Sequence, residues 1–474
     1  MSYYLNPSEF GAGISRRQLL QTSAMGFGNL ALATLLGDEA AAANSLATHA
    51  THFPARAKRV IFLFMKGGPS HLDTFDYKPQ LQKDDGKALP FDKPRVQFAP
   101  TGNLLASPWR FRKYGQSGIE VSDLFPHVAE CVDDLCILNS VHGTNAAHGG
   151  AVLKLHTGSD TFVRPSMGAW VTYGLGTEND NLPGFITICP TLAHGGVNNW
   201  GSAFLPANCQ GVPLGVASQP SSEAQVKYIH NARWPREVQR MQLDMLAKVN
   251  RDHLASTGPN SSLEARINSF ELAFRMQSEV PTIQDISDET EATLHLYGLD
   301  QTVTEDFGRQ CLLARRFAER GVRFIQVTHS DTNVQWDQHG NLRAGHAKNA
   351  FEVDRPIAGL LRDLKQRGLL EDTLVMWGGE FGRTPVAQGK DGRDHNPEGF
   401  TMWLAGAGVK AGFKYGATDE YGYYAVENKM HIHDLHATLL YLMGLDHLRL
   451  THRYAGRDFR LTDVAGHVHT DILA

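Results

Sequence analysis

Short apolar runs recur along the chain and end at glycine or polar clusters, as strands buried in a parallel sheet do. Stretches with apolar residues at helical spacing lie between them, such as Thr304–Arg320 and Val353–Leu364. This alternation predicts an α/β fold with a mostly parallel central sheet flanked by helices. The expected strands are Arg59–Met65, Leu135–Leu138, Phe185–Ile188, Val322–Val327, Leu374–Trp377 and Phe400–Leu404.

The pattern changes between about residues 222 and 280, where helical spacing continues without strands. Residues 256–260, Ser-Thr-Gly-Pro-Asn, separate two such stretches, which predicts a helical hairpin inserted in the main domain. We expect the apolar stripes of these helices to serve packing rather than to bind a cofactor. The two stripes are Val238, Met241, Met245 and Val249, and Leu263, Ile267, Phe270 and Phe274.

The first residues have the order of an export signal rather than of a folded domain. Ser15–Leu20 contains the Arg16-Arg17 pair, an apolar segment covers Met25–Leu36, and small residues fill Ala40–Ala43. We therefore expect a twin-arginine signal peptide over residues 1–43, a linker over 44–57 and the main domain over 58–474. The protein is expected in the periplasm or outside the cell, and no further segment has the apolar length of a membrane span.

Composition excludes several classes of function. The 474 residues carry a formal net charge of −5, and no dense stripe of lysine and arginine is present, so nucleic-acid binding is not expected. The five cysteines contain no CxxC pair, which argues against a thiolate zinc site and leaves room for at most one or two disulfides. The 22 histidines make metal chemistry a hypothesis to pursue.

The stretch Leu374–Phe400 carries the densest candidate chemistry. Its apolar strand meets Gly378 and Gly379 and is expected to lead into one loop that presents Glu380, Arg383, Asp394 and His395. Ligands of parallel sheets collect beyond the carboxyl ends of the strands. Arg383 could clamp a tetrahedral oxyanion or lock the loop through a salt bridge, and these alternatives are equal on the sequence alone.

Further acidic and imidazole residues follow other strands. Asp73 comes after the first strand, and Asp337 with His339 comes after the strand that ends at Val327. Because such loops meet at one edge of a parallel sheet, these side chains are expected to converge. Oxygen and nitrogen ligands without thiolates suit a divalent metal: zinc, manganese or calcium.

Several motifs together resemble a family of exported bacterial proteins catalogued as domain of unknown function 1501, within the alkaline phosphatase/sulfatase superfamily. The resemblance runs from about Arg59 to Ala474. It implies an alkaline-phosphatase-like α/β fold with a divalent metal centre that hydrolyses phosphate or sulfate esters. The motifs are GGPSHLDTFD, WDQHG, GGEFGRTP, GRDHNPEGFT and HDLHATLLYLMGLDH.

The resemblance also implies roles for single residues. Asp73 resembles the metal carboxylate of the first strand, and Glu380 stands where the superfamily has the Asp of an Asp-His pair. Two positions depart from the pattern: Phe381 replaces an expected imidazole, and the nucleophile position falls near His148, where no hydroxyl or thiol stands. The Cys-x-Pro-x-Arg maturation motif of sulfatases is absent. The implied metal residues are Asp73, Asp337, His339, Glu380, Asp394 and His395.

The sequence thus predicts an exported metal-dependent hydrolase of phosphate or sulfate esters that lacks the usual Ser, Thr or Cys nucleophile. His148 could serve as general base or nucleophile, or metal-bound water could attack. A small molecule or a glycan ester is the expected substrate, although no sugar subsite is recognisable. The alternative is a ligand-binding or assembly protein that keeps the fold without turnover.

Overall fold

The computed structural model describes residues 48–92, 100–231, 233–258, 260–330 and 335–474. Within these residues the central sheet has nine strands in the order β13-β5-β12-β9-β1-β8-β6-β7, and β16 pairs with β5. Its strands are β1 (Arg59–Met65), β5 (Leu135–His142), β6 (Phe185–Ile188), β7 (Val212–Leu214), β8 (Phe324–His329), β9 (Thr373–Gly378), β12 (Phe400–Ala405), β13 (Phe413–Tyr415) and β16 (Met430–His431).

Strand β1 lies in the middle of this sheet, parallel to β8 and to β9. Strand β12 runs antiparallel to both of its neighbours, β5 and β9. The sheet is therefore mixed but mainly parallel, which confirms the predicted α/β class. The carboxyl ends of β1, β8 and β9 lie side by side at one edge, and the connections that leave them carry the candidate chemistry.

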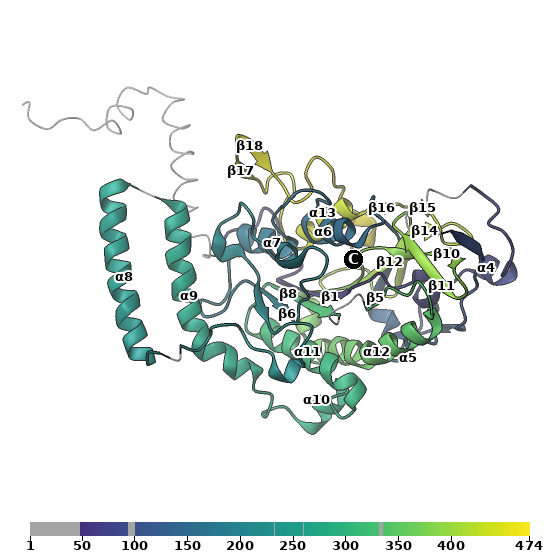
Figure 1. The fold of residues 1–474 in the computed structure, drawn as a ribbon, viewed down its shortest axis with the longest axis horizontal. Helices are drawn as coiled ribbons and strands as arrows, with labels where there is room; N and C mark the ends of the chain where they lie inside the picture. The colour runs from purple at the N-terminus through teal and green to yellow at the C-terminus, as the bar shows by residue number, and fades with distance from the viewer. Residues whose placement is uncertain (1–47, 93–99, 232, 259, 331–334) are drawn as a thin grey trace, which may run out of the picture.

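Helices cover both faces of the sheet (Figure 1). Helices α5 (Pro126–Ala129), α11 (Thr302–Glu319) and α12 (Leu342–Gln366) share a core with Ile61 and Leu63 of β1. Helices α6 (His148–Thr157), α7 (Met167–Leu175) and α13 (Ile432–Leu442) share the other core with Phe62 and Phe64. Side chains of a strand alternate between faces, so β1 is apolar from Val60 to Met65 because both of its faces are covered.

The stretch that follows β9 differs from its prediction. A single loop was expected between Trp377 and Phe400, but β10 (Gly382–Gln388) and β11 (Gly392–Asn396) form an antiparallel hairpin, and β2 (Thr101–Leu104) pairs with β10. All of β11 and the first five residues of β10 are buried. The sequence did not predict this hairpin, because a strand buried on both faces shows no alternation of polar and apolar residues.

Smaller elements complete the described part of the chain. Two further hairpins pair β3 with β4 and β17 with β18, and β14 pairs with β15. All five cysteines are buried and free, so the bridges for which the sequence left room do not form. The bounds are α3 (His71–Thr74), α4 (Pro79–Lys83), α10 (Glu291–Leu296), β3 (Phe111–Tyr114), β4 (Ile119–Ser122), β14 (Ala417–Thr418), β15 (Ala425–Glu427), β17 (His452–Tyr454) and β18 (Arg457–Phe459).

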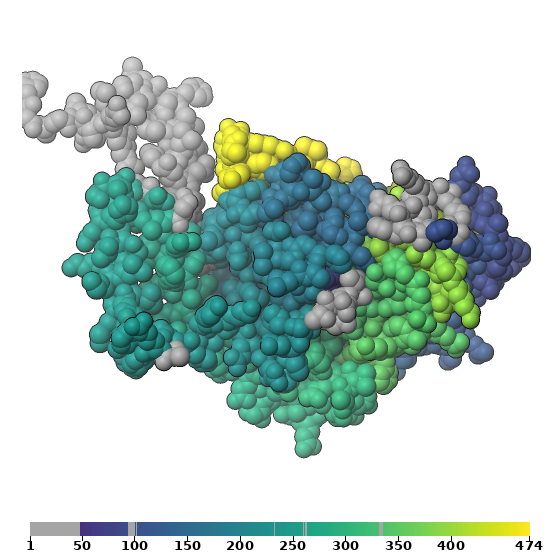
Figure 2. Space-filling view, in the orientation of Figure 1, coloured from purple at the N-terminus to yellow at the C-terminus, as the bar shows by residue number. Residues whose placement is uncertain are grey.

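The expected helical hairpin is present as α8 (Arg236–Thr257) and α9 (Ser261–Gln284). It forms a lobe at the side of the molecule, with α8 outermost (Figures 1 and 2). The expectation that its apolar stripes serve packing is wrong for α8, all of whose residues are described and none of which is buried. The spacing marks a helical face correctly, but it does not say whether another element covers that face.

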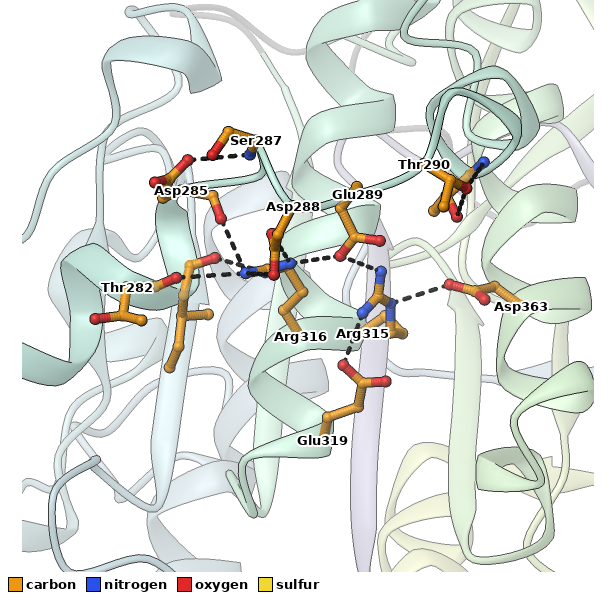
Figure 3. Close-up of polar contacts among 12 residues, drawn as sticks. Thr282, Asp285, Ser287, Asp288, Glu289, Thr290, Arg315, Arg316, Glu319 and Asp363 are labelled. Atoms are coloured by element: carbon orange, nitrogen blue, oxygen red, sulfur yellow. Dashed lines mark hydrogen bonds and ion pairs between the residues drawn. The ribbon is translucent and has the colours of Figure 1, made fainter.

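A buried ion network ties the base of the hairpin to the main body (Figure 3). Arg316 of α11 donates from Nε to the carbonyl oxygen of Ile283 at 2.8 Å. Its neighbour Arg315 forms ion pairs with Glu289 at 2.6 Å and with Asp363 of α12 at 3.0 Å. Both arginines are buried, so the chain leaving α9 is fixed by charge-assisted bonds away from solvent. No described helix is long and apolar enough to cross a bilayer.

Candidate metal centre

Three separate connections supply the centre. Helix α6 begins at His148, the connection from β8 to α12 carries Asp337 and His339, and strand β11 carries Asp394 and His395. In the described part of the chain, two groups of these side chains are close enough to hold a metal ion. They are His148, Asp337 and His395, and His339, Asp394 and His395, with ligand atoms within 4.8 Å of one another in each group.

Asp337 is the centre of this arrangement. Its carboxylate oxygens lie 3.2 Å from Nε2 of His148, 2.9 Å from Nε2 of His339 and 3.0 Å from Nε2 of His395. Three imidazoles from distant parts of the chain thus present the same ring nitrogen to one carboxylate.

The opposite nitrogen of each ring is held by an oxygen acceptor. Nδ1 of His148 lies 2.7 Å from Oε1 of Glu380, and Nδ1 of His395 lies 2.6 Å from the carbonyl oxygen of Ala146. Nδ1 of His339 contacts Oε1 of Gln388. A carboxylate and a backbone carbonyl only accept hydrogen bonds, so the protons of His148 and His395 belong on Nδ1.

This tautomer leaves a lone pair on Nε2, aimed at an anionic carboxylate. A lone pair facing a carboxylate oxygen is repulsive unless a metal ion or a second ring proton lies between them. The residues therefore fit a divalent metal ion, because imidazole nitrogens whose other ring nitrogen donates to an oxygen are the usual ligands of such ions. Three imidazoles and one carboxylate make up the donor set.

The electrostatics of the centre agree with this fit. Burial acts to lower the pKa of His395, which falls to about 4 against the opposing effect of Asp337, so this ring is neutral at neutral pH. Burial alone would raise the pKa of Asp337, but its contacts with the rings of His148, His339 and His395 outweigh burial and hold that pKa far below its ordinary value. The site thus offers an ionised carboxylate and at least one neutral imidazole, the forms that bind a cation.

Asp394 adds an unsatisfied acceptor beside these ligands. Its Oδ1 accepts the backbone N–H of His395 at 2.8 Å, whereas its Oδ2 is buried with no hydrogen-bond partner among the described residues. A buried carboxylate oxygen without a donor costs free energy unless a cation satisfies it. Asp394 is therefore a plausible ligand in the group with His339 and His395.

Glu380 has a different place from the predicted one. It belongs to neither candidate group; its two oxygens accept the backbone N–H of Gly67 at 3.0 and 3.1 Å, and Oε1 also holds Nδ1 of His148. Burial acts to raise the pKa of Glu380, but the contact with His148 lowers it below the ordinary value. Glu380 thus orients a ligand from behind, as carboxylates do in other metal sites.

Asp73 also falls outside both groups. Its carboxylate faces Arg393, 2.8 Å from Nε, and accepts the hydroxyl of Ser70 at 2.5 Å. Asp73 and Arg393 are both fully buried, so this is an internal ion pair. The implied metal role of Asp73 is not supported by this geometry, because the guanidinium occupies the place that a cation would take.

Arg383 locks the loop rather than facing the cavity. Its side chain is fully buried, and Nε donates to the carbonyl oxygen of Gly68 at 2.9 Å. Nη2 lies 2.7 Å from Oδ1 of Asp337 and 3.1 Å from the carbonyl oxygen of Trp336. Of the two alternatives the salt bridge is present, since backbone carbonyl oxygens and the carboxylate of Asp337 hold the buried guanidinium.

The ligands open onto a cavity of about 420 Å³. None of its described lining residues carries a hydroxyl or thiol. Phe381 contacts the rings of His148 and His395, with ring centroids 4.9 and 4.4 Å apart, at the place where an imidazole was expected. The lining residues are Ala147, His148, Gly149, His194, Asp337, His339, Gln388 and His395.

Two residues of the centre were missed from the sequence. His194 stacks on His148 with ring centroids 5.0 Å apart, and Gln388 holds His339. His194 lies in a Gly-rich connection between β6 and β7 that gave no periodic signal. Gln388 was hidden because its strand was taken for a loop. A predicted hairpin within Leu374–Phe400 would have made Gln388 a candidate residue of the centre.

Comparisons with solved structures find several similar folds at low sequence identity. Ps i-CgsB in complex with k-i-k-neocarrahexaose is 11% identical over 82% of this chain and 72% of that chain, with a TM-score of 0.37. The lipoteichoic acid synthase LtaP from Listeria monocytogenes is 9% identical over 89% and 80%, with a TM-score of 0.35. The PsFucS1 sulfatase from Pseudoalteromonas sp. is 13% identical over 86% and 72%, with a TM-score of 0.34.

No curated protein matches the chain. One family model does, and it spans the whole body of the fold that carries the imidazole centre. The chain belongs to the family described as "Protein of unknown function (DUF1501)", whose model matches residues 57–473.

Proposed function

We propose that this chain is an exported metal-dependent hydrolase of phosphate or sulfate esters. Its own side chains His148, Asp337, His339 and His395 hold a divalent metal, with Asp394 beside them. The observation that carries the proposal is the convergence of three Nε2 atoms on the carboxylate of Asp337. Their Nδ1 atoms are bound to acceptors, so the lone pairs face one point.

The donor set narrows the identity of the metal. Three imidazole nitrogens and one carboxylate suit zinc, and manganese less well, whereas calcium prefers six or more oxygen ligands. We therefore propose zinc. The absence of thiolates near the site fits a catalytic rather than a purely structural zinc, because structural sites usually contain cysteine.

The protein residues keep the donors in place. Glu380 keeps the proton of His148 on Nδ1, and the carbonyl oxygen of Ala146 does the same for His395. Arg383 fixes the carboxylate of Asp337 from the buried side. A divalent ion supplies Lewis acidity toward the ester oxygen and toward water. Because no described lining residue offers a hydroxyl or thiol, water rather than a side chain attacks, and the nucleophile role considered for His148 is not part of this proposal.

The ester class rests on the motif resemblance described above, and export rests on the Arg16-Arg17 pattern. The geometry of the centre determines neither the ester class nor export. Residues 1–43 lie outside the described residues. The cavity of about 420 Å³ is within the size range of small-molecule sites, so we propose that the reacting ester group enters it, while the rest of a small molecule or a glycan stays outside.

Elemental analysis of the purified mature protein, combined with an ester screen, tests this proposal. We expect about one zinc ion or more per chain and hydrolysis of at least one aryl phosphate or aryl sulfate. His395→Ala removes a ligand and should abolish both. A protein that binds no zinc, manganese or calcium, even after incubation with each ion, contradicts the proposal.

A non-catalytic binding protein is the second candidate. The lack of a side-chain nucleophile among the described lining residues and the presence of Phe381 where an imidazole was expected favour it. Calorimetry separates the two functions: a metal-loaded protein that binds phosphate or sulfate esters without cleaving any of them is a binding protein on this fold.

A further inference from the structure

Helix α8 carries an apolar stripe that the chain itself leaves open. Met241, Met245 and Val249 are 67%, 71% and 54% exposed. Residues four apart lie on neighbouring turns of one face of a helix, so the three side chains form a continuous strip. Large exposed apolar side chains in a contiguous patch mark an interaction surface.

The opposite face of α8 is the one that meets α9. Arg240 donates two hydrogen bonds of 2.7 Å to Glu271 of α9, and Gln277 of α9 donates to Gln239 at 2.9 Å. At 3.6 residues per turn, Gln239 and Arg240 lie about 120° and about 140° from Met245, on either side of the face opposite to it. The stripe therefore faces away from α9, on the outermost helix of the lobe (Figure 1).

The apolar surface extends beyond the stripe. Leu246 and Phe270 are both exposed and lie at an apolar cavity of about 630 Å³ between the hairpin and the main domain. Tyr228, almost fully exposed, lines the same cavity. The exposed apolar surface thus includes side chains of both helices and of the connection before them.

The charges beside the stripe are arranged in two halves. At 3.6 residues per turn, Glu237, Asp244, Lys248 and Arg251 fall along one edge of it. Along this edge the acidic pair lies in the first half of the helix and the basic pair in the second half. Asp244 also pairs with Arg240 of the same helix at 2.9 Å, and Asp252 lies on the stripe itself, outside both pairs. An antiparallel copy of the same helix would place each acidic half beside a basic half, as edge charges do in helical pairs.

We propose that α8 pairs with α8 of a second copy of this chain, antiparallel, about a twofold axis near Met245. Such an interface is self-complementary, as twofold dimers require. The 22-residue helix is about 33 Å long. A contact along this stripe alone lies at the small end of specific interfaces. Dimer formation does not depend on the proposed hydrolysis.

Engineered cysteines test the pairing and its direction in the full mature chain. All five native cysteines are buried, so a new exposed cysteine is the only accessible one among the described residues. Met245→Cys lies at the proposed axis and should form a disulfide-linked dimer under mild oxidation. Ala255→Cys, exposed at the end of α8, should not. Equal cross-linking at both positions overturns the antiparallel arrangement.

Charge exchange supplies a second test, by sedimentation velocity at micromolar concentrations. Lys248→Asp places like charges against Asp244 of the second copy and should weaken the dimer at least about tenfold. The double variant Asp244→Lys/Lys248→Asp restores opposite charges and should restore the dimer. Failure of the double variant to recover, despite an unchanged circular dichroism spectrum, contradicts the pairing.

The unmodified chain decides the remaining outcomes. A monomer at all micromolar concentrations overturns the proposal. So does a chain that stays monomeric and binds vesicles of anionic phospholipid through Met245, since the stripe would then face a membrane. A dimer that Met245→Lys converts to monomer supports it.

Discussion

Oε1 of Glu380 lies 2.7 Å from Nδ1 of His148, although 232 positions of sequence separate the two residues. This bond decides which nitrogen of His148 is left for a metal. The sequence identified both residues as candidate site residues, but only the structure shows that Glu380 orients the ring of His148. The predictions below follow from such relationships.

Glu380→Gln should weaken zinc binding by about 10- to 100-fold, which is the usual effect of losing a carboxylate behind a metal histidine. The amide group of glutamine also places N–H against the N–H of Gly67, which now donates to both carboxylate oxygens. Competition with a chromophoric chelator measures the affinity. Glu427→Gln, at an exposed position of β15, is the matched control and should leave the affinity unchanged.

Asp337→Asn should reduce zinc affinity at least about hundredfold and remove ester hydrolysis, because the carboxylate is the common neighbour of three imidazoles. Metal content after dialysis measures the loss. Asp123→Asn breaks an exposed ion pair with Arg112 and should retain the metal. Full zinc content in Asp337→Asn would remove Asp337 from the ligand set.

Metal retention should depend on pH in a defined direction. Hydrogen bonding to Asp337 raises the pKa of His339; for His148, burial lowers the pKa, but contacts with Asp337 and Glu380 outweigh it and raise it. In the metal-free site these rings hold protons up to a higher pH than ordinary histidine, so protons compete with the metal as the pH falls through the raised values. Dialysis at about pH 8 should retain zinc and dialysis at about pH 5 should release it. Equal retention at both values contradicts the prediction.

Arg316→Ala should destabilise the fold by about 3–5 kcal/mol, because it leaves the buried carboxylate of Glu289 with one partner fewer in the network of Figure 3. Urea unfolding measures the change in the free energy of unfolding. Arg320→Ala, four residues along the same stretch, breaks a half-exposed pair with Glu279 and should cost less than about 1 kcal/mol. Similar losses for both variants would mean that the network does not anchor the hairpin.

Acid should weaken the fold through its buried histidines. Burial lowers the pKa of His436 to about 3, from an ordinary value of 6.5. Below pH 6.5 the unfolded chain takes a proton that the folded chain refuses, so stability falls as the pH drops. His436→Gln can keep the hydrogen bond to the carbonyl oxygen of Leu155 and should recover up to about 3 kcal/mol at about pH 4. Unfolding midpoints at several pH values show whether the slope decreases; an unchanged slope counts against this role of His436.

Six of the nine strands of the central sheet could be predicted because their residues are apolar on both faces. Strand β1 ends at Met65 as expected, whereas β8 and β9 extend to His329 and Gly378, beyond the expected Val327 and Trp377. The hairpin of β10 and β11 could not, since it is buried without being apolar: Arg383 and Arg393 lie inside it, bound to carbonyl groups and to carboxylates. Hydrophobic periodicity does not detect a buried strand whose polar groups are satisfied by distant partners.

The candidate site divides in the same way. His148 opens α6 after β5, Asp337 and His339 follow β8, and His395 lies in β11 after β9. All four thus come from segments that leave one edge of the sheet, and topology predicts that they converge. Asp73 has the same position in sequence terms, yet Arg393 faces it. Asp73 and Arg393 are 320 positions apart, so no local sequence pattern shows that they pair. The sequence could therefore name the candidate metal residues, but it could not tell the ligands from the residues that hold the ligands in place.

The spread of the ligands along the chain governs when a metal can be captured. His148 leaves the ribosome early and His395 late. Only a piece of the chain that spans residues 148–395 contains the full donor set. Bringing such distant segments together costs loop-closure entropy until the sheet between them has formed. Under the proposed function, metal loading follows folding: a nascent chain or a proteolytic fragment should bind zinc no more tightly than an ordinary histidine-rich peptide does.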